Sequence, residues 1–252
     1  MSVADNHPKT FDMADHPTFA AAAEAFKALN VPFWLDQGTL LGLVRDGKLL
    51  ETDHDIDLGV WAEDYKKVKP EFLRELKLEE AWLETYKPHQ LTISSLTGEA
   101  KMINIAFYRR SSGNARKKVY YPHSSLIADL LIRIAVFSAH AAAGTLGIKL
   151  TRSSRLHLAI LFAAKLIPAP FWRIFGHLAG RSQYFFKPYV IMAVPEEFFM
   201  NLEQISVNSL KLPVPSNPEA YLELKYGPDW RKPRQDWIFW KDDGAVIGRT
   251  KG

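Results

Sequence analysis

The chain of 252 residues contains no cysteine, which excludes a disulfide framework and a zinc site built on thiolates and favours a reducing compartment. It also lacks a long hydrophobic run. The longest uncharged stretch, residues 134–148, includes a histidine and two glycines and falls short of the roughly 20 residues that span a bilayer. The N-terminal segment MSVADNHPKTFDMADH is polar and acidic, unlike a secretory signal. These absences predict a cytoplasmic protein.

Acidic residues are scarce across the middle of the chain. Residues 109–195 contain thirteen Lys or Arg and one acid, Asp129, a local charge of 13 − 1 = +12, whereas the whole chain carries +4. Such a field attracts phosphates, lipid head groups or nucleic acid, although a solvated basic face has the same composition. The cations lie among long apolar runs, which suits the inner face of a membrane better than a nucleic-acid groove, so we expect no nucleic-acid partner.

The first half of the chain alternates helical and extended patterns. We expect a helix at 17–30, a strand at 31–36, a turn at 37–39, a helix from 40 to about 47, a strand at 53–60, a helix at 63–80 that Pro70 begins or kinks, and strands at 90–98 and 101–110. This order predicts an α+β fold in which a mixed sheet is flanked by helices. The basic run at 116–118 is expected to form a solvated loop.

The segment ETDHDIDLGV, residues 51–60, places four acids within seven positions. Asp53, Asp55 and Asp57 alternate with apolar residues at the period of a strand, so we expect the three aspartates to line one face. Carboxylates this close repel one another unless a cation lies between them, and oxygen ligands suit Mg²⁺ or Mn²⁺. An exposed acidic turn is the alternative. The Val, Ile and Leu alternation around the acids favours a metal-binding strand.

The preceding sequence QGT, residues 37–39, adds a second feature of a phosphate site. Gly38 lets the backbone approach a ligand closely, and Thr39 offers a hydroxyl. The helix expected from residue 40 directs free N–H groups and its positive dipole end toward an anion. Together with the acidic strand that follows, this turn predicts that a bound cation meets the phosphate of a substrate.

The stretch FWLDQGTLLGLVRDGKLLETDHDIDLGV, residues 33–60, resembles the signature of the LicD/fukutin family, within the polymerase-β-like nucleotidyltransferase superfamily. The C-terminal YGPDWRKPRQDW, residues 226–237, is similar to the end of that family's pattern and to fukutin-type members most of all. The resemblance implies a nucleotidyltransferase-type fold. It also implies metal-dependent transfer of a phospho-substituted group, such as phosphocholine or an alditol phosphate, from a CDP-linked donor to a glycan or lipid-linked glycan.

The resemblance also implies roles for individual residues. Asp55 and Asp57 match the acid pair that binds the metals, and Asp53 matches the acid just before it. Gly38 and Thr39 match the phosphate turn. Arg45 matches an arginine of the family's helix, which would neutralise a donor phosphate or hold the acidic strand in place.

The later strand departs from the superfamily pattern. A third acid is usual there, and the matching position in KMINIAFY is Asn104, with Glu99 as an alternative. An amide orients a ligand but does not act as a base. Asp53 would then substitute, or the acceptor would lose its proton without a protein base, or turnover would be impaired.

Aromatic residues near the C-terminus complete the set of candidate site residues. Tyr226, Trp230 and Trp237, with Gly227 between the first two, offer faces on which a cytosine or a sugar could stack. Closure of the hydrophobic core is the other reading, and it is favoured for Trp237 and Trp240 over Trp230.

The chain is expected to divide into a polar tail at 1–16, a nucleotidyltransferase-like core at 17–123, a helical basic and apolar insertion at 124–192, and a C-terminal part at 193–252 that completes the active-site cleft. The insertion would be either a helical subdomain or a peripheral membrane contact. The alternatives to the phosphotransferase are a nucleotidyltransferase that acts on a small molecule and an inactive, membrane-associated protein that binds nucleotides.

Overall fold

The computed structural model describes residues 16–50, 53–80, 90–96, 101–121, 125–142, 166–207 and 210–250. It divides the chain into two compact units. The first contains Met1–Thr85, His89–Val119 and Val190–Arg249, and the second contains Tyr86–Pro88, Tyr120–Tyr189 and Thr250–Gly252. The predicted N-terminal tail, apart from its last residue, and residues 143–165 of the predicted insertion lie outside the described residues.

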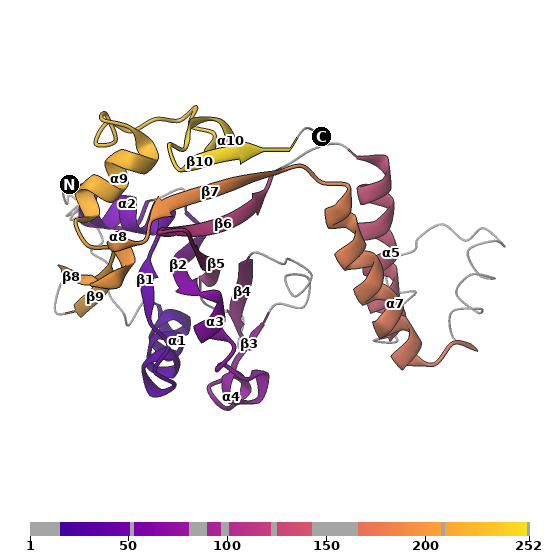
Figure 1. Cartoon of the computed structure of the whole chain (residues 1–252). Coiled ribbons are helices and arrows are strands. Elements are labelled where there is room, and N and C mark those ends of the chain that lie inside the picture. Colours follow the sequence, from indigo (N-terminus) through magenta and orange to yellow (C-terminus); the bar gives the residue numbers. More distant parts are fainter. Residues whose placement is uncertain are drawn as a thin grey trace, which may run out of the picture. The chain divides into compact units, whose positions relative to one another are not determined.

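An eight-stranded sheet forms the centre of the first unit (Figure 1). The strand order is β1-β2-β5-β6-β7-β10, with β4 paired to β5 and β3 paired to β4. β2 and β5 run parallel, whereas β1–β2, β3–β4, β4–β5, β5–β6 and β7–β10 are antiparallel. The strands are β1 Phe33–Leu35, β2 Asp55–Trp61, β3 Leu78–Glu80, β4 Gln90–Ser95, β5 Met102–Ser111, β6 Asn114–Tyr120, β7 Tyr189–Pro195 and β10 Val246–Arg249. The expected mixed sheet with flanking helices is confirmed.

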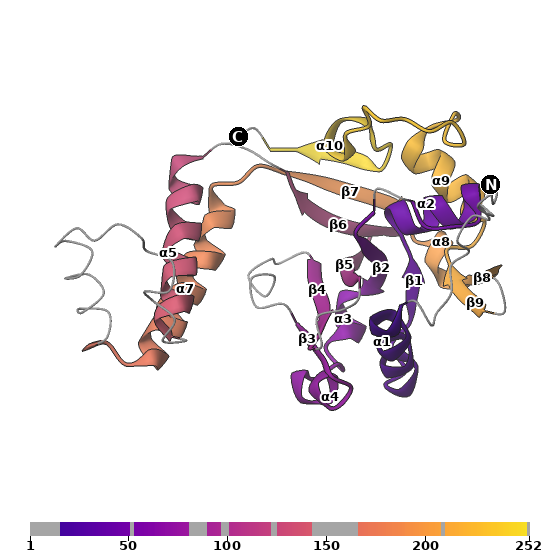
Figure 2. The ribbon, with the colours of Figure 1, turned by 180° about the vertical axis from the view of Figure 1, so that it is seen from behind.

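Short helices and a small second sheet surround this sheet. Helix α1 contacts β3, β4 and β5, α3 contacts β2 and β5, and α2 contacts both β2 and α9. Figure 2 shows α2 and α9 from behind, close to the end of β1. The helices are α1 Pro17–Ala28, α2 Gln37–Asp46, α3 Ala62–Tyr65, α4 Pro70–Glu75, α8 Glu197–Met200, α9 Pro218–Tyr226 and α10 Phe239–Asp242; β8 Glu203–Val207 pairs with β9 Leu210–Val214.

The core of this unit is built around one indole ring. Trp34 is fully buried and lies opposite Gly59 in the β1–β2 register. A Cβ atom at position 59 would lie 2.2 Å from the indole nitrogen, so only glycine allows this packing. The other side of the ring stacks on Phe199, with the centroids 4.4 Å apart. This packing fixes β1, which leads into α2, and β2, which contains Asp55 and Asp57.

Most of the predicted elements of the first half are found, with two corrections. Residues 37–39 are not a separate turn but the first turn of α2. The helix expected over 63–80 is interrupted: α3 ends at Tyr65, Pro70 begins α4, and Lys77, with a φ of 58°, directs the chain into β3. Residues 193–252 also contribute strands, of which β10 joins the main sheet.

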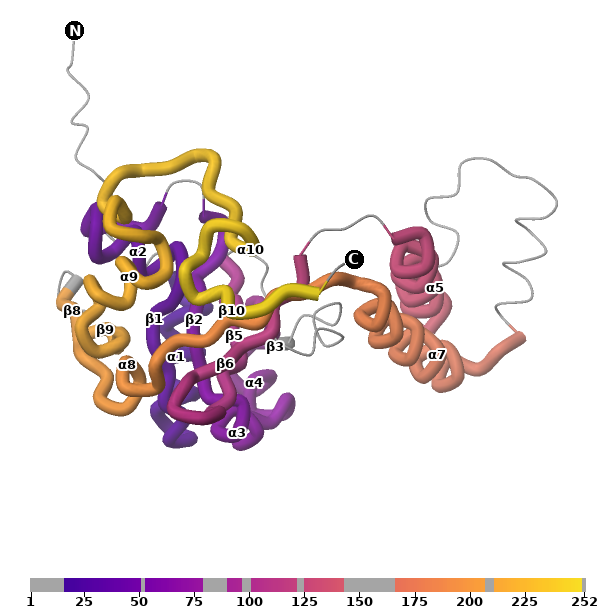
Figure 3. Tube along the Cα trace, turned by 45° about the horizontal axis from the view of Figure 1, so that its top comes forward, coloured from indigo at the N-terminus to yellow at the C-terminus, as the bar shows by residue number. Residues whose placement is uncertain are grey.

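The second unit contains a pair of helices, α5 Leu126–Ala142 and α7 Ala169–Ser182, followed by the short 3-10 helix η3 Gln183–Phe185. Figure 3 shows α5 and α7 lying side by side, and contacts between them are numerous along their length. None of the helices that the structure describes is both long and apolar enough to cross a membrane.

Candidate active site

Two of the predicted aspartates lie on β2, the strand next to the parallel partner β5. Asp55 and Asp57 are partly buried, whereas Ile56 and Leu58 between and after them are fully buried. This alternation follows from the period of an extended chain and places both carboxylates on the face opposite the apolar core. The predicted acid pair on a strand is therefore present in the fold.

Asn104 on β5 lies directly beside this pair. It is opposite Asp57 in the parallel register, and its side-chain nitrogen donates a hydrogen bond to the Asp55 carboxylate. The Thr92 hydroxyl on β4 donates to the amide oxygen of Asn104 at 2.7 Å, which fixes the amide so that its N–H groups face the acid. The structure thus places an amide beside the acid pair. The alternative, Glu99, lies outside the described residues.

Asp53 precedes β2 and faces α2. A Cβ atom at Gly38 would lie 2.4 Å from the Asp53 carboxylate, so the absence of a side chain there lets an acid approach the first turn of the helix. One carboxylate oxygen of Asp53 is buried without a hydrogen-bond partner. Burial and the nearby Asp55 raise the pKa of Asp53, which Lys101 and His54 partly offset. The sequence predicts that a ligand approaches the backbone closely at Gly38. In the structure, the group that lies there is the Asp53 carboxylate.

The first turn of α2 is tied to β2 by three hydrogen bonds. The Thr39 hydroxyl accepts from the Asp57 backbone N–H at 2.9 Å, and the Gln37 side chain donates to the Asp57 carboxylate at 3.2 Å. The backbone N–H of Asp36 donates to the carbonyl of Asp57 at 3.0 Å. Thr39, predicted as a ligand to phosphate, is fully buried, and its hydroxyl oxygen is engaged in positioning the acid strand.

Nearby cations neutralise the charge of Asp57 only in part. Burial, Asp55 and Asp36 raise the pKa of Asp57 from 3.8 to about 8, and Lys117 offsets only part of this effect. A carboxylate with a raised pKa in a cleft is a feature of functional sites, because either a proton or a cation stabilises it. Asp57 is therefore protonated at neutral pH or paired with a cation.

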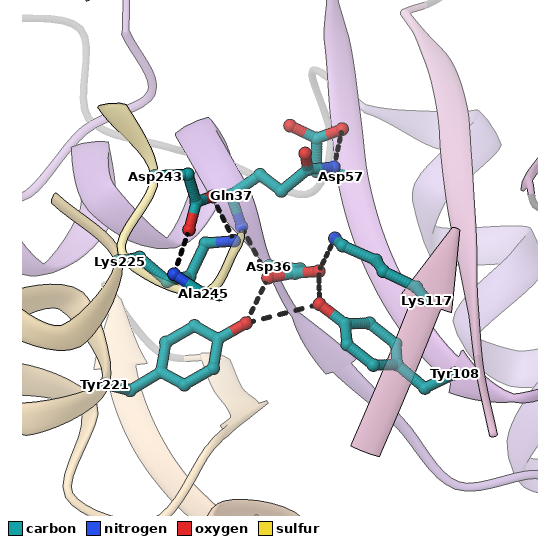
Figure 4. Close-up of polar contacts among 9 residues, drawn as sticks. All are labelled: Asp36, Gln37, Asp57, Tyr108, Lys117, Tyr221, Lys225, Asp243 and Ala245. Atoms are coloured by element: carbon teal, nitrogen blue, oxygen red, sulfur yellow. Dashed lines mark hydrogen bonds and ion pairs between the residues drawn. The ribbon is translucent and has the colours of Figure 1, made fainter. Parts of the chain in front are cut away.

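A buried ion-pair network lies next to Asp57 (Figure 4). Asp36 caps α2 and accepts hydrogen bonds from the hydroxyls of Tyr108 at 2.7 Å and Tyr221 at 2.6 Å. The Lys117 ammonium lies 3.1 Å from the same carboxylate. Burial alone would raise the pKa of Asp36, but Lys117, Lys225 and the two hydroxyls bring it well below its ordinary value. Asp36 is thus a permanent anion that holds β5, β6 and α9 to the start of α2.

A second buried ion pair closes the far side of the network. Lys225 of α9 lies 2.9 Å from Asp243, and both side chains are almost fully buried. Burial would lower the pKa of Lys225, but Asp243 and Asp36 raise it, so the ammonium stays charged. Tyr226 follows, and its pKa is raised by burial and by Asp243, Asp36, Asp57 and Asp53. Its hydroxyl therefore stays protonated beside the acids.

The remaining predicted residues differ in position. Arg45 pairs with its neighbour Asp46, through Nε at 3.0 Å and a terminal nitrogen at 2.8 Å, and does not hold the acidic strand. Gly227 ends α9 at a φ of 84°, a conformation that favours glycine. Trp230 is only 4% exposed and lies under Arg231, so it packs in the interior and presents no free face for stacking. The half-exposed ring is Trp237, whose centroid lies 4.8 Å from that of Tyr226.

The donor set suits a hard divalent cation. Asp55 and Asp57 provide carboxylate oxygens, which Mg²⁺ and Mn²⁺ prefer, and one or two protein carboxylates suffice when substrate phosphates supply further ligands. In the part of the chain that the structure describes, no three His, Asp or Glu side chains are grouped closely enough to hold a metal ion. The expected convergence of three aspartates is therefore not found, because β2 begins at Asp55 and Asp53 is directed toward Gly38.

The reading of the sequence missed the network around Asp36. Lys117 was expected in a solvated loop, but it lies on β6 with its side chain buried. An aspartate directly before a helix is a capping signal, so Asp36 could have been found from the sequence. Its partners could not, because Lys117 and Tyr221 are 81 and 185 residues away along the chain.

Comparison with known proteins gives short but consistent matches. Residues 30–128 match the family described as LicD/FKTN/FKRP, nucleotidyltransferase domain. Ribitol-5-phosphate transferase FKTN of Mus musculus is 47% identical over 45 residues, which cover 18% of this chain and 10% of that protein. Ribitol 5-phosphate transferase FKRP of Mus musculus is 45% identical over 38 residues, covering 15% and 8%. The matches thus span about a tenth of these relatives.

A solved structure of distant sequence also matches part of this chain. The antibiotic-resistance factor ANT(2'')-Ia covers 69% of this chain and 95% of its own, with 12% identity and a TM-score of 0.34. This likeness is too distant to indicate a function.

Proposed function

We propose, from the premise that residues 30–128 form a LicD/FKTN/FKRP nucleotidyltransferase domain, that this protein is a transferase of phospho-substituted groups. It would move phosphocholine or an alditol phosphate from a CDP-activated donor to a hydroxyl of a glycan or lipid-linked glycan. The two relatives named above are ribitol-5-phosphate transferases, which supports the alditol phosphate as the transferred group. The observation that carries the proposal is the Asp55–Asp57 pair, fixed below α2 with the pKa of Asp57 raised to about 8.

The aspartate pair would hold Mg²⁺ or Mn²⁺. When bound, such a cation neutralises phosphate charge and positions the donor for transfer. Asn104 holds the Asp55 carboxylate in place, and Gln37 and Thr39 do the same for Asp57 through its side chain and its backbone. These contacts supply the fixed geometry that phosphoryl-type transfer requires of a protein.

The start of α2 would receive a donor phosphate. Gly38 leaves room for an anionic oxygen against the first turn, a place that Asp53 takes in this structure. Helix N-termini favour negative charge, so a phosphate oxygen suits the same position. Arg45 lies on the same helix, and its side chain remains partly exposed although it pairs with Asp46. We expect it to contribute positive charge near the donor, without a direct contact to the acid strand.

In the transfer step, the acceptor hydroxyl oxygen bonds to the phosphorus that carries the transferred group. The bond from this phosphorus to the bridging oxygen breaks, and CMP leaves with that oxygen. The hydroxyl proton goes to Asp53, whose carboxylate the donor phosphate would displace from its place against Gly38, which leaves it free to act as a general base. Asp53 would thereby take the role that an acid at position 104 would otherwise have.

The proposal is tested by following CMP release from CDP-alditol and CDP-choline donors in the presence of Mn²⁺ and glycan acceptors. Asp57→Asn should lower the rate by about a hundredfold or more, the scale for losing one group of a preorganised electrostatic site. Asp229→Asn, on the exposed surface, is the matched control and should leave the rate unchanged. Equal CMP release by wild type and Asp57→Asn would contradict the assignment.

Two other functions lead to different results in the same assay. A nucleotidyltransferase acting on a small molecule would release pyrophosphate from CTP instead of CMP from a CDP-linked donor. Asn104 favours a third reading, a membrane-associated protein that binds nucleotides without turnover, because it replaces the usual acid. Cytidine-nucleotide binding without CMP or pyrophosphate release would support that reading.

A further inference from the structure

The helix pair of the second unit packs through small residues. Ala135 and Ser138 of α5 and Gly176 and Ala179 of α7 are buried. A Cβ atom at Gly176 would lie 2.9 Å from the Cβ of Ser138, so the two backbones approach as closely as side chains allow. Such contacts are typical of helices that pack against each other in a membrane, where no hydrophobic effect draws large side chains inward.

The large apolar side chains of α7 point the other way. Phe171, Ile174, Phe175 and Leu178 recur at the spacing of one helix face and are 53% to 64% exposed. Leu126, at the start of α5, is 89% exposed. An exposed apolar stripe of this size marks a surface that binds something.

Charge indicates what this surface binds. Residues 124–192 contain eight Lys or Arg and the single acid Asp129. Arg173 and Arg181 of α7 are exposed. At 100° per residue, Arg181 lies beside the apolar stripe, about 20° from Ile174, whereas Arg173 lies about 150° from the centre of the stripe. Apolar side chains combined with cations suit an anionic lipid surface. A second copy of the same face would bring two sets of cations together, which disfavours self-association.

We propose that α7 and the start of α5 bind the surface of an anionic lipid bilayer. The apolar stripe on α7 would enter the boundary between head groups and acyl chains, with Arg181 beside it at the level of the anionic head groups. Because no described helix is long enough to span a bilayer, the helices would lie at its surface. This inference does not depend on the proposed transferase activity.

The test is flotation of the full chain with vesicles of phosphatidylcholine, alone or with 30% phosphatidylglycerol as an arbitrary test composition. We expect binding to the anionic vesicles, weakened by salt. Phe171→Asp/Leu178→Asp should reduce it by at least about tenfold, because charged side chains do not enter the apolar boundary. The matched control is Met200→Asp/Ile247→Asp, two exposed apolar residues of the first unit, which should bind like wild type. Circular dichroism checks that each variant keeps its helices.

Charge is tested separately with Arg181→Gln, which should weaken anionic-vesicle binding by about fivefold. Arg173→Gln, on the side of α7 away from the stripe, is the matched control and should have a smaller effect. Equal binding to neutral and anionic vesicles, or unchanged binding by Phe171→Asp/Leu178→Asp, would overturn the proposal. A dimer that binds no vesicles, and that Phe171→Asp/Leu178→Asp converts to a monomer in analytical ultracentrifugation, would instead identify the face as a contact between two copies.

Discussion

Replacing Asp57 by Asn should stabilise the metal-free protein at alkaline pH, although a hydrogen-bonded carboxylate is lost. Burial, Asp55 and Asp36 raise the pKa of Asp57 to about 8, compared with 3.8 in a free chain. The folded protein therefore binds one more proton than the unfolded chain between these two values, and its stability falls as the pH rises through them. Asparagine is similar in shape and carries no charge, so it avoids this loss.

The expected gain depends on pH. At 1.36 kcal/mol per pKa unit, the difference between 3.8 and about 8 corresponds to roughly 6 kcal/mol. The Asp57 side chain is only partly buried, and solvent screens part of that repulsion, so we expect a gain of about 2 kcal/mol at pH 9. Near pH 4, where the carboxyl is protonated in the folded protein, the variant should show no such gain.

The assay is urea unfolding of wild type and Asp57→Asn at pH 4.5 and pH 9 in the presence of a chelator. Asp46→Asn is the control, because the hydrogen bond from Arg45 lowers the pKa of Asp46 instead of raising it. Removing the Asp46 carboxylate should therefore not stabilise the protein at pH 9. If Asp57→Asn is no more stable than wild type at pH 9, the carboxylate is not repelled by its neighbours and the electrostatic reasoning fails.

Three further substitutions test other parts of the site and its scaffold. Lys117→Met leaves the buried Asp36 carboxylate unpaired and should lower the free energy of unfolding by about 3–5 kcal/mol in urea titrations, with partial recovery in Asp36→Asn/Lys117→Met. Gly59→Ala would place a methyl group 2.2 Å from the indole ring opposite and should cost about 1–3 kcal/mol, whereas Gly248→Ala meets no atom within 4 Å and should cost less. Asn104→Asp adds a third carboxylate beside the acid pair, so it should tighten Mn²⁺ binding in calorimetry and lower the stability of the metal-free protein at pH 9; unchanged Mn²⁺ affinity would show that position 104 does not face the metal.

The acidic strand and its surroundings could be predicted from local patterns. The alternation of aspartates with Ile56 and Leu58 indicated a strand with one apolar face, and this strand is β2. Asn104 was inferred instead from the resemblance, which matches it to a third acid on a later strand, and the structure pairs it with Asp57. The strand prediction succeeded because the period of a strand fixes which side chains share a face, whatever the rest of the fold does.

The buried network around Asp36 could not be predicted from local patterns. A run of three cations at 116–118 looks solvated in the sequence, yet Lys117 points inward, where its ammonium pairs with Asp36 and lies over the Tyr108 ring. Buried charges are retained only when a partner lies beside them, and this partner comes from a distant segment. Trp230 was misjudged for a related reason, since which tryptophan is buried depends on packing that no local pattern encodes.

Titration calorimetry of Mn²⁺ at pH 7, in buffers of different ionisation enthalpy, tests the central claim most directly. We predict Mn²⁺ uptake with release of about one proton per metal, because the cation replaces the proton that the raised pKa leaves on Asp57. The release should disappear at pH 9 and the uptake should disappear in Asp55→Asn/Asp57→Asn. Absence of uptake by the wild type, or equal uptake by wild type and the double variant, would contradict a metal site at this aspartate pair.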